Sequence, residues 1–462
     1  MAITPIISRK PLTSCLCLLI AVQFLLIGLF NGFVTGRAVA QTGTIPIIRD
    51  AETEALISDY ARPILQAARQ RTDIRVIIVN DNSFNAFVDG RRIFVNSGAL
   101  IEADTPNEII GVLAHEVGHL AGGHQYRLRD RIKQAQTFAV VGMLLGLGTG
   151  LAGGGAAGSG IMAGSQEMAL RNLLSYQRSE ETIADRSAVT YLNQTGQSAK
   201  GMLKTFERFS NNLALSGIRP DPYRQSHPLP QTRIAALQEL AEKSPYYDKK
   251  DPPDLQLRHD LVRAKLAAYQ RKSAQLRAFF AREPNGLPVR YEQAINAVET
   301  GAPQQAVIRI EALIKDRPQN PYFHELLGDA YIKANKPAQA AQAYKQAVAL
   351  DKYKSPQLYL GYGRALLAAN GAANNQLAVK ALKIALSKEN DDPSIYNFLA
   401  LAYGQAGKPA LADLATADRH YYSGNIGEAR YFAARAKQGL KPGSADWLRA
   451  QDILNITAPN MR

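Results

Sequence analysis

Residues 105–123 read TPNEIIGVLAHEVGHLAGG and predict a single helix with well-marked ends. Thr105 can cap the first turn, a proline follows at the first helical position, and Glu108 stands three residues after the cap. The pair Gly122-Gly123 can end the helix. Most other positions are apolar, so we expect this helix to be buried in the core of a domain.

The same helix carries three ionisable side chains, His115, Glu116 and His119. Residues four positions apart lie about one turn apart on one helical face, so both imidazoles can bind the same metal ion while the carboxylate stays close to it. Unpaired charge in a core is costly, and a metal ion offers the partner. The spacing therefore predicts a hydrolytic site with one zinc ion per chain, which needs a third protein ligand.

An acidic segment downstream offers candidates for the third ligand. Glu181 and Asp185 stand one turn apart in a predicted helix over 179–192. Two acids on a helix usually mark a solvated face. Here they follow a His-Glu-x-x-His motif, and this composite pattern favours a role in the site.

His124 and His227 are further candidates for the site. In the metzincin pattern a third histidine ligand stands six residues after the second histidine of the motif. That position is Gln125, and His124 comes one place early, so we reject the metzincin interpretation. His124 either supports a ligand from behind or is exposed. His227 lies in a proline-rich run over 219–230 and by itself reads as a loop histidine.

The carboxy-terminal half shows an internal repeat. After a polar linker over 246–254 the chain becomes helical and alanine-rich, and its turn positions Gly301, Asn335, Asn370 and Gly407 are 34, 35 and 37 residues apart. This is the period of tetratricopeptide repeats. The residues that fit the repeat pattern are Leu327, Gly328, Tyr331, Ala340, Tyr344 and Ala347. We expect them to build a solenoid whose concave surface binds a partner.

The first 40 residues predict an export signal. Arg9 and Lys10 precede an apolar run over 12–33, and Ala38-Val39-Ala40 is typical of a cleavage site before Gln41. An uncleaved membrane anchor is the alternative. Both cysteines, at positions 15 and 17, lie in this segment, so the mature chain would have neither a disulfide nor a thiol nucleophile. We expect the mature protein to be secreted.

The chain is basic, with a formal net charge of +14. A basic surface can bind nucleic acid, but export favours anionic lipids or envelope polymers as partners, and no nucleic-acid-binding motif is present. We therefore expect no nucleic-acid partner.

A glycine-rich segment over 138–164 contains no charged residue and ten glycines. Five of these glycines recur at four-residue spacing, which suits close helix packing of the kind seen in membranes. We expect a mobile lid or a hairpin that contacts a membrane surface beside the site. A true transmembrane span is the alternative.

Taken together, these features resemble the gluzincin metallopeptidases related to HtpX and the CAAX prenyl endopeptidase, and within them the periplasmic BepA type with tetratricopeptide repeats. The resemblance covers residues 45–241 and extends through the repeats. It rests on Asn85-Ala86-Phe87, Arg92–Asn96, His115–His119 with His124, Glu181–Asp185, and Ser226-His227-Pro228 with Arg233.

The resemblance implies roles for these residues. His115, His119 and Glu181 would bind zinc, and Glu116 would be the general base. Asp185, and with it His124 and Arg233, would support the ligands from behind. His227 would join Glu116 in the catalytic set by reaching the metal and holding the enzyme closed.

Two further expectations concern the reaction. The developing oxyanion needs a donor besides zinc, and Arg233, Arg224 or His227 could supply it. We expect substrate to lie extended along Arg92–Asn96 and to add a strand to an exposed sheet edge. Such binding would tolerate many sequences, which suits an enzyme of protein quality control.

We expect a mostly α protein: a signal peptide over 1–40, a gluzincin-type zinc metallopeptidase domain with a small β-sheet over 41–254, and an α-solenoid of tetratricopeptide repeats over 255–462. The predicted function is cleavage of misassembled or unfolded outer-membrane proteins in envelope quality control. The solenoid would dock the outer-membrane assembly machinery. The alternative is a chaperone or scaffold for outer-membrane protein assembly with a largely silent metal site.

Overall fold

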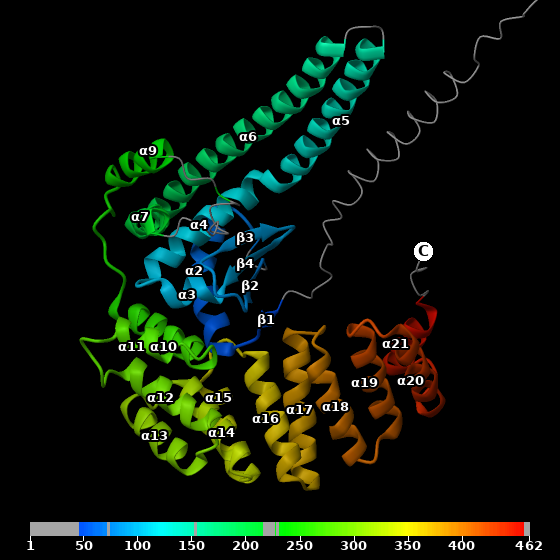
Figure 1. Cartoon of the computed structure of the whole chain (residues 1–462). Coiled ribbons are helices and arrows are strands. Elements are labelled where there is room, and N and C mark those ends of the chain that lie inside the picture. The colour runs from blue at the N-terminus through cyan, green and yellow to red at the C-terminus, as the bar shows by residue number, and fades with distance from the viewer. Residues whose placement is uncertain (1–45, 72–73, 152–154, 216–226, 228–230, 457–462) are drawn as a thin grey trace, which may run out of the picture. The chain divides into compact units, whose positions relative to one another are not determined.

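The computed structural model describes residues 46–71, 74–151, 155–215, 227 and 231–456 (Figure 1). The predicted signal peptide, both cysteines and Arg224 lie outside these residues. None of the described helices combines the length and the apolar character that crossing a bilayer requires.

A four-stranded sheet forms one side of the first domain. Its strands are β1 (Ile47–Ile48), β2 (Arg75–Val79), β3 (Ala86–Asp89) and β4 (Arg92–Asn96), in the spatial order β1-β2-β4-β3. β4 runs parallel to β2 and antiparallel to β3. The expectation that substrate adds to Arg92–Asn96 is therefore wrong, because both neighbours already use the main-chain groups of this strand. The edge next to β4 is β3.

Helices cover the sheet and share one apolar core with it. They are α2 (Ala51–Ala67), α3 (Ser97–Glu102), α4 (Pro106–Gly122), α7 (Lys200–Leu215) and α9 (Gln231–Glu242). Leu56 of α2, Val95 of β4 and Leu113 of α4 belong to this core. α4 is buried over most of its length, as the sequence predicted, so its polar side chains are held in a rigid, water-poor setting.

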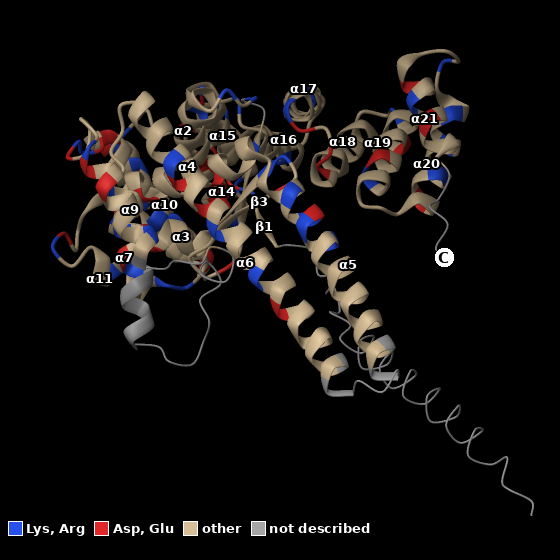
Figure 2. Ribbon diagram, turned by 90° about the horizontal axis from the view of Figure 1, so that it is seen from above, with Lys and Arg blue, Asp and Glu red and all other residues tan. Residues whose placement is uncertain are grey.

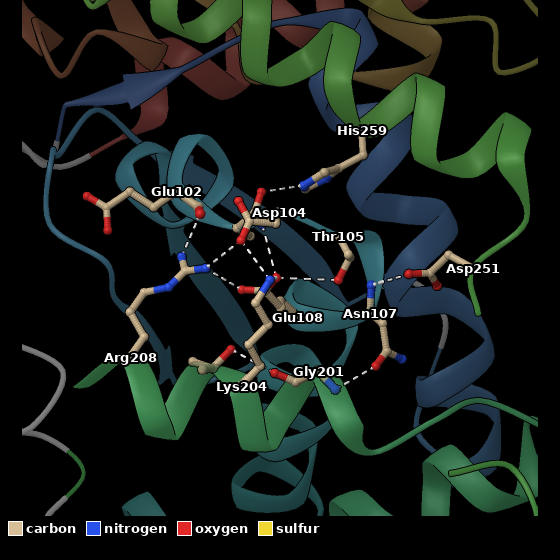
Figure 3. A network of polar contacts seen from close by, with 12 residues as sticks. Glu102, Asp104, Thr105, Asn107, Glu108, Gly201, Lys204, Arg208, Asp251 and His259 are labelled. Atoms are coloured by element: carbon tan, nitrogen blue, oxygen red, sulfur yellow. Dashed lines mark hydrogen bonds and ion pairs between the residues drawn. The ribbon is translucent and has the colours of Figure 1, made fainter. Parts of the chain in front are cut away.

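The start of α4 is fixed by a polar network (Figure 3). The helix begins after Thr105, but the threonine hydroxyl makes no capping bond to a helical N–H. Glu108 instead reaches back to accept from the N–H of Asp104 at 3.0 Å. It is fully buried and pairs with Lys204 and Arg208 of α7 at 3.0 and 2.7 Å. These contacts set the rotation of α4 and thereby the direction of its histidines.

Two long helices follow α4 and pack against each other as an antiparallel hairpin. α5 (His124–Leu151) begins directly after Gly123, whose φ of 63° ends α4, and α6 (Gly155–Gln194) returns to the domain. The hairpin extends away from the sheet (Figure 1). The helix predicted over 179–192 is the returning end of α6.

The rest of the chain is an array of paired helices, as predicted. Tyr344 packs against two glycines of neighbouring helices, because a Cβ at Gly328 or Gly361 would come within 2.6 Å of its ring. The helices are α10 (Pro253–Tyr269), α11 (Ser273–Phe279), α12 (Leu287–Glu299), α13 (Pro303–Asp316), α14 (Pro321–Lys333), α15 (Pro337–Leu350), α16 (Pro356–Ala369), α17 (Ala372–Lys388), α18 (Pro393–Gln405), α19 (Pro409–Tyr422), α20 (Ile426–Gly439) and α21 (Ala445–Asn455).

The array joins the first domain through a shared helix. Leu266 of α10 belongs to the core of the first domain, whereas Leu261 and Ala264 of the same helix belong to the first core of the array. Arg49, beside β1, also binds Glu389 at the end of α17 at 2.5 Å. The predicted boundary after residue 254 thus falls within a helix that packs on both sides.

Candidate metal centre

The two histidines of the motif lie on one face of α4. Their Nε2 atoms are 3.0 Å apart, and His115 is fully buried. Glu116 stands between them in the chain and is only 1% exposed. α4 thus presents two imidazole nitrogens to the same point and keeps a carboxyl group close by.

α6 adds Glu181 to this point. A Cβ at Gly118 would lie 2.9 Å from the carbonyl oxygen of Ala184, so glycine between the two histidines lets α6 approach α4 closely. Glu181 then places one carboxylate oxygen 3.3 Å from Nε2 of His115 and the other 3.2 Å from Nε2 of His119. The predicted third ligand therefore faces both imidazoles.

His227 completes the cluster from a distant part of the chain. Its Nδ1 lies 3.2 Å from Nε2 of His115 and 3.2 Å from both carboxylate oxygens of Glu181. Its Nε2 lies 3.4 Å from Glu116. Ligand atoms of His115, His119, Glu181 and His227 all lie within 4.8 Å of one another.

This arrangement fits a metal ion in chemistry and in size. Tetrahedral zinc, with ligand bonds of about 2.0–2.1 Å, holds its ligand atoms about 3.3 Å apart. The nearest contacts among the four side chains are 3.0 to 3.3 Å. Three imidazole nitrogens and a carboxylate are also the donors that zinc accepts.

A carboxylate orients the first histidine from behind. Nδ1 of His115 lies 3.0 Å from Asp185, and Nη2 of Arg233 donates to the same carboxylate at 2.9 Å. Nη1 of Arg233 also pairs with Glu181 at 2.8 Å. A histidine ligand commonly donates its other N–H to a carboxylate, which fixes its tautomer and ring orientation.

The second histidine is supported by a longer chain of contacts. Nδ1 of His119 lies 2.8 Å from Nδ1 of His124, and Nε2 of His124 lies 2.7 Å from Glu180. Arg127 donates to Glu180 at 2.9 Å. His124 is thus buried and not exposed. Glu180 and Arg127 were not predicted, although Glu180 adjoins the proposed ligand Glu181 in the sequence.

Burial and the neighbouring charges shift the pKa values of the cluster in different directions. Burial opposes protonation of His115, but hydrogen bonds to Asp185 and Glu181 outweigh it and raise its pKa to about 9. Burial lowers the pKa of His119 to about 3. Burial would raise the pKa of Glu181, yet His227, His115 and His119 hold it well below the usual value.

A cavity of about 270 Å³ opens onto the cluster. It is lined by Phe87 and Val88 of β3 and by Glu116, His119 and His227, among others. Of the three candidates for the oxyanion donor, only His227 lines this cavity among the described residues. Arg233 lines a different cavity together with Asp185, and Arg224 lies outside the described residues.

Comparison with known proteins finds two families along the chain. Residues 48–241 match the model of peptidase family M48, and residues 291–353 and 326–373 match a tetratricopeptide repeat model. The chain is 24% identical over 421 residues to the beta-barrel assembly-enhancing protease of Escherichia coli (strain K12), covering 88% of this chain and 83% of that protein. A putative beta-barrel assembly-enhancing protease of Vibrio cholerae is 25% identical over 295 residues, 62% of this chain and 60% of that protein.

Among solved structures, the crystal structure of MamA matches 35% of this chain and 90% of its own chain, with 22% identity and a TM-score of 0.28, which is too low to establish a common fold. The sequence matches give the organisation of the chain: an M48 peptidase domain followed by tetratricopeptide repeats.

Proposed function

Since residues 48–241 are a peptidase family M48 domain, we propose that the chain is a zinc-dependent endopeptidase. One zinc ion would be held by His115, His119 and Glu181. The observation that carries this proposal is the convergence of these side chains and His227 within 4.8 Å, with Glu116 buried beside them.

Zinc, when bound, supplies the Lewis acidity that polarises a scissile carbonyl and activates water. Glu116 takes the proton from that water and later delivers it to the nitrogen of the leaving amine. Burial raises the pKa of Glu116, which helps its carboxyl group to hold the proton between these two events. Asp185 and His124 contact the Nδ1 atoms of the two imidazoles, so each Nε2 is free to face the point where zinc would be held.

An unfolded substrate would bind along β3. Asn96 N–H donates to the carbonyl of Asn85, and pairing alternates along an antiparallel ladder. The main-chain groups of Ala86 and Val88 therefore point away from β4. Gly90, next in this alternation, points its N–H outward to the side chain of Gln125 at 3.1 Å. Main-chain pairing at this edge would place an extended peptide over the cavity with little regard to its sequence.

His227 would regulate access. Its position beside Glu181 and Glu116 is the position that an incoming carbonyl needs, so its presence would keep the enzyme closed. The same side chain could donate to the oxyanion after it moves, because it lines the cavity.

The biological role follows from the relatives, whose name describes enhancement of beta-barrel assembly. We propose a signal peptide over 1–40, a peptidase domain over 41–254 and a partner-binding solenoid over 255–462. The mature protein would work in the periplasm, dock to outer-membrane assembly machinery through the solenoid, and cleave misassembled or unfolded outer-membrane proteins. We propose no nucleic-acid partner.

A second function is favoured by the position of His227. With a fourth side chain in the cluster, the metal site would be silent at rest, and the chain would act as a chaperone or scaffold for outer-membrane protein assembly through its solenoid. The two functions are compatible in one protein.

The test is zinc content and casein cleavage of the purified mature chain with and without a chelator. Cleavage should require zinc and return when zinc is restored. Glu116→Gln should lower cleavage about 10²- to 10⁴-fold while zinc stays bound, and Glu167→Gln, an exposed acid of α6, should change neither. Undiminished cleavage by Glu116→Gln would reject the assigned base, and zinc-free, chelator-insensitive activity would reject the metal.

A further inference from the structure

The described outer part of the α5–α6 hairpin has an apolar surface that nothing in the described chain covers. We call it the apolar tip. Leu144 is 63% exposed and Phe138 is 48% exposed. The tip comprises Phe138, Val140, Val141, Leu144, Leu145 and Leu147 of α5 and Ile161 of α6. Figure 2 shows no Lys, Arg, Asp or Glu on the described outermost turns of either helix.

In the apolar tip, small residues lie between the two helices and large apolar residues are exposed, which is the opposite of the packing expected in water. Gly142 and Gly146 are buried, and a Cβ at Gly142 would lie 2.1 Å from Oγ of Ser165. Small residues thus form the contact between the helices, and large apolar side chains point outward. A hairpin in water buries its large apolar residues, whereas helices in lipid pack on small residues and expose large ones.

The exposed residues occupy more than one stripe along α5, on the side that faces away from α6. Phe138, Val141 and Leu145 follow one helical stripe, whereas Leu144 and Leu147 follow another. A partner that binds a helix in a groove needs one such stripe. Lipid, which would contact the hairpin from several sides, explains why both stripes are apolar.

Basic residues stand where lipid headgroups would lie. From Gln134 to Gln166 the sequence has no charged residue, and Arg131 and Lys133 come directly before this segment on α5. On α6 the first charged residue after this segment is Glu167, which pairs with the exposed Arg171 at 2.5 Å. Lysine and arginine at the end of an apolar segment reach headgroups, and anionic lipids attract them.

We propose that the apolar tip inserts into one leaflet of an anionic lipid bilayer. From Phe138 to Leu151 the arm of α5 measures about 21 Å at 1.5 Å per residue, which is less than the roughly 30 Å hydrocarbon core but enough to enter one leaflet. α5 begins at His124 and α6 carries Glu181, so the inserted hairpin would hold the metal centre beside the membrane surface. This proposal does not depend on catalysis.

The test uses tryptophan fluorescence of the mature chain. The single native tryptophan is replaced (Trp447→Phe), and Leu144→Trp is added in the Glu116→Gln background. With vesicles of phosphatidylethanolamine and phosphatidylglycerol, the new tryptophan should shift its emission to the blue and be quenched by brominated acyl chains. Leu401→Trp, at an exposed site of α18, is the matched control and should remain unquenched.

Two further variants separate the contributions. Arg131→Gln and Lys133→Gln should each weaken binding to these vesicles about fivefold, corresponding to about 1 kcal/mol per charge. Leu145→Trp repeats the depth measurement if Leu144→Trp fails to fold. Absence of quenching at both tip positions, with zinc content unchanged, would overturn the proposal and point to a protein partner for the tip.

Discussion

Nε2 of His124 lies 2.7 Å from a carboxylate oxygen of Glu180, while its other nitrogen lies 2.8 Å from Nδ1 of His119. Asp185 contacts His115 directly. Glu180 takes the corresponding position behind His119, but the imidazole of His124 lies between them. Both histidines of α4 are fixed through the nitrogen that faces away from the cluster. Metal affinity should depend on these supports.

Glu180→Gln should weaken zinc binding about tenfold, because the imidazole chain behind His119 loses its charged end and the ring becomes less firmly oriented. Competition with a chromophoric chelator measures this without any assay of cleavage. Glu167→Gln on the same helix is the charge control. Unchanged zinc affinity in Glu180→Gln would show that the chain of contacts does not support the ligand.

His227→Ala should raise basal cleavage several-fold and retain zinc, because the three proposed ligands remain and a position opens for substrate. Cleavage of a quenched fluorescent casein, measured together with zinc content, tests this. His324→Ala is the control, because this half-buried histidine of α14 does not belong to the metal cluster. Equal or lower activity with zinc retained would mean that His227 serves the reaction rather than closing the site.

The sequence predicted the part of the site that follows helical spacing. His115, Glu116 and His119 share a turn of α4, Glu181 and Asp185 share a turn of α6, and spacing alone placed each pair on one face. Glu180 could not be predicted in the same way. Its role depends on how the start of α5 lies against α6, which no local pattern encodes.

The fold was predictable to the same extent. The spacing of tetratricopeptide residues predicted the helical array. Gly328 and Tyr344 belong to this sequence pattern, and they also pack against each other in the structure. Strand order was not predictable, and the expected edge strand, Arg92–Asn96, lies between two other strands. The strand Arg92–Asn96 is apolar because it is buried between two neighbouring strands. An edge strand that packs on one face can also be apolar, so the sequence does not distinguish the two positions.

Val88→Pro should lower kcat/KM for casein about fivefold, because proline removes an outward N–H worth about 1 kcal/mol without removing a bond to β4. Val88→Ala keeps the N–H and changes only the side chain, so it is the matched control. Zinc content should stay the same in both. If the two variants have equal activity, the edge of β3 does not bind substrate through its main chain.

A buried lysine joins the first domain to the helical array. Lys265 of α10 lies 2.5 Å from Asp50 at the start of α2, 3.4 Å from Glu325 of α14 and 3.5 Å from Glu52. Tyr291 also donates to Glu52 at 2.9 Å. Three acids thus face one lysine in a largely buried site, so ionising all three acids is costly.

Burial, the largest effect, raises the pKa of Glu325 to about 8 and that of Glu52 to about 7. Between pH 4.5 and 8 the folded chain therefore binds more protons than the unfolded chain at these acids, and their contribution to stability is full below pH 4.5 and is lost as pH rises through 8. Relative to Glu325→Gln, the natural chain should lose up to about 1.4 kcal/mol of unfolding free energy per pH unit in this window. Urea unfolding at several pH values measures this loss, with Glu283→Gln as the control for one charge on the array surface. Parallel pH profiles for the natural chain and Glu325→Gln would show that Glu325 is already ionised in the folded protein, because Lys265 then compensates its burial fully.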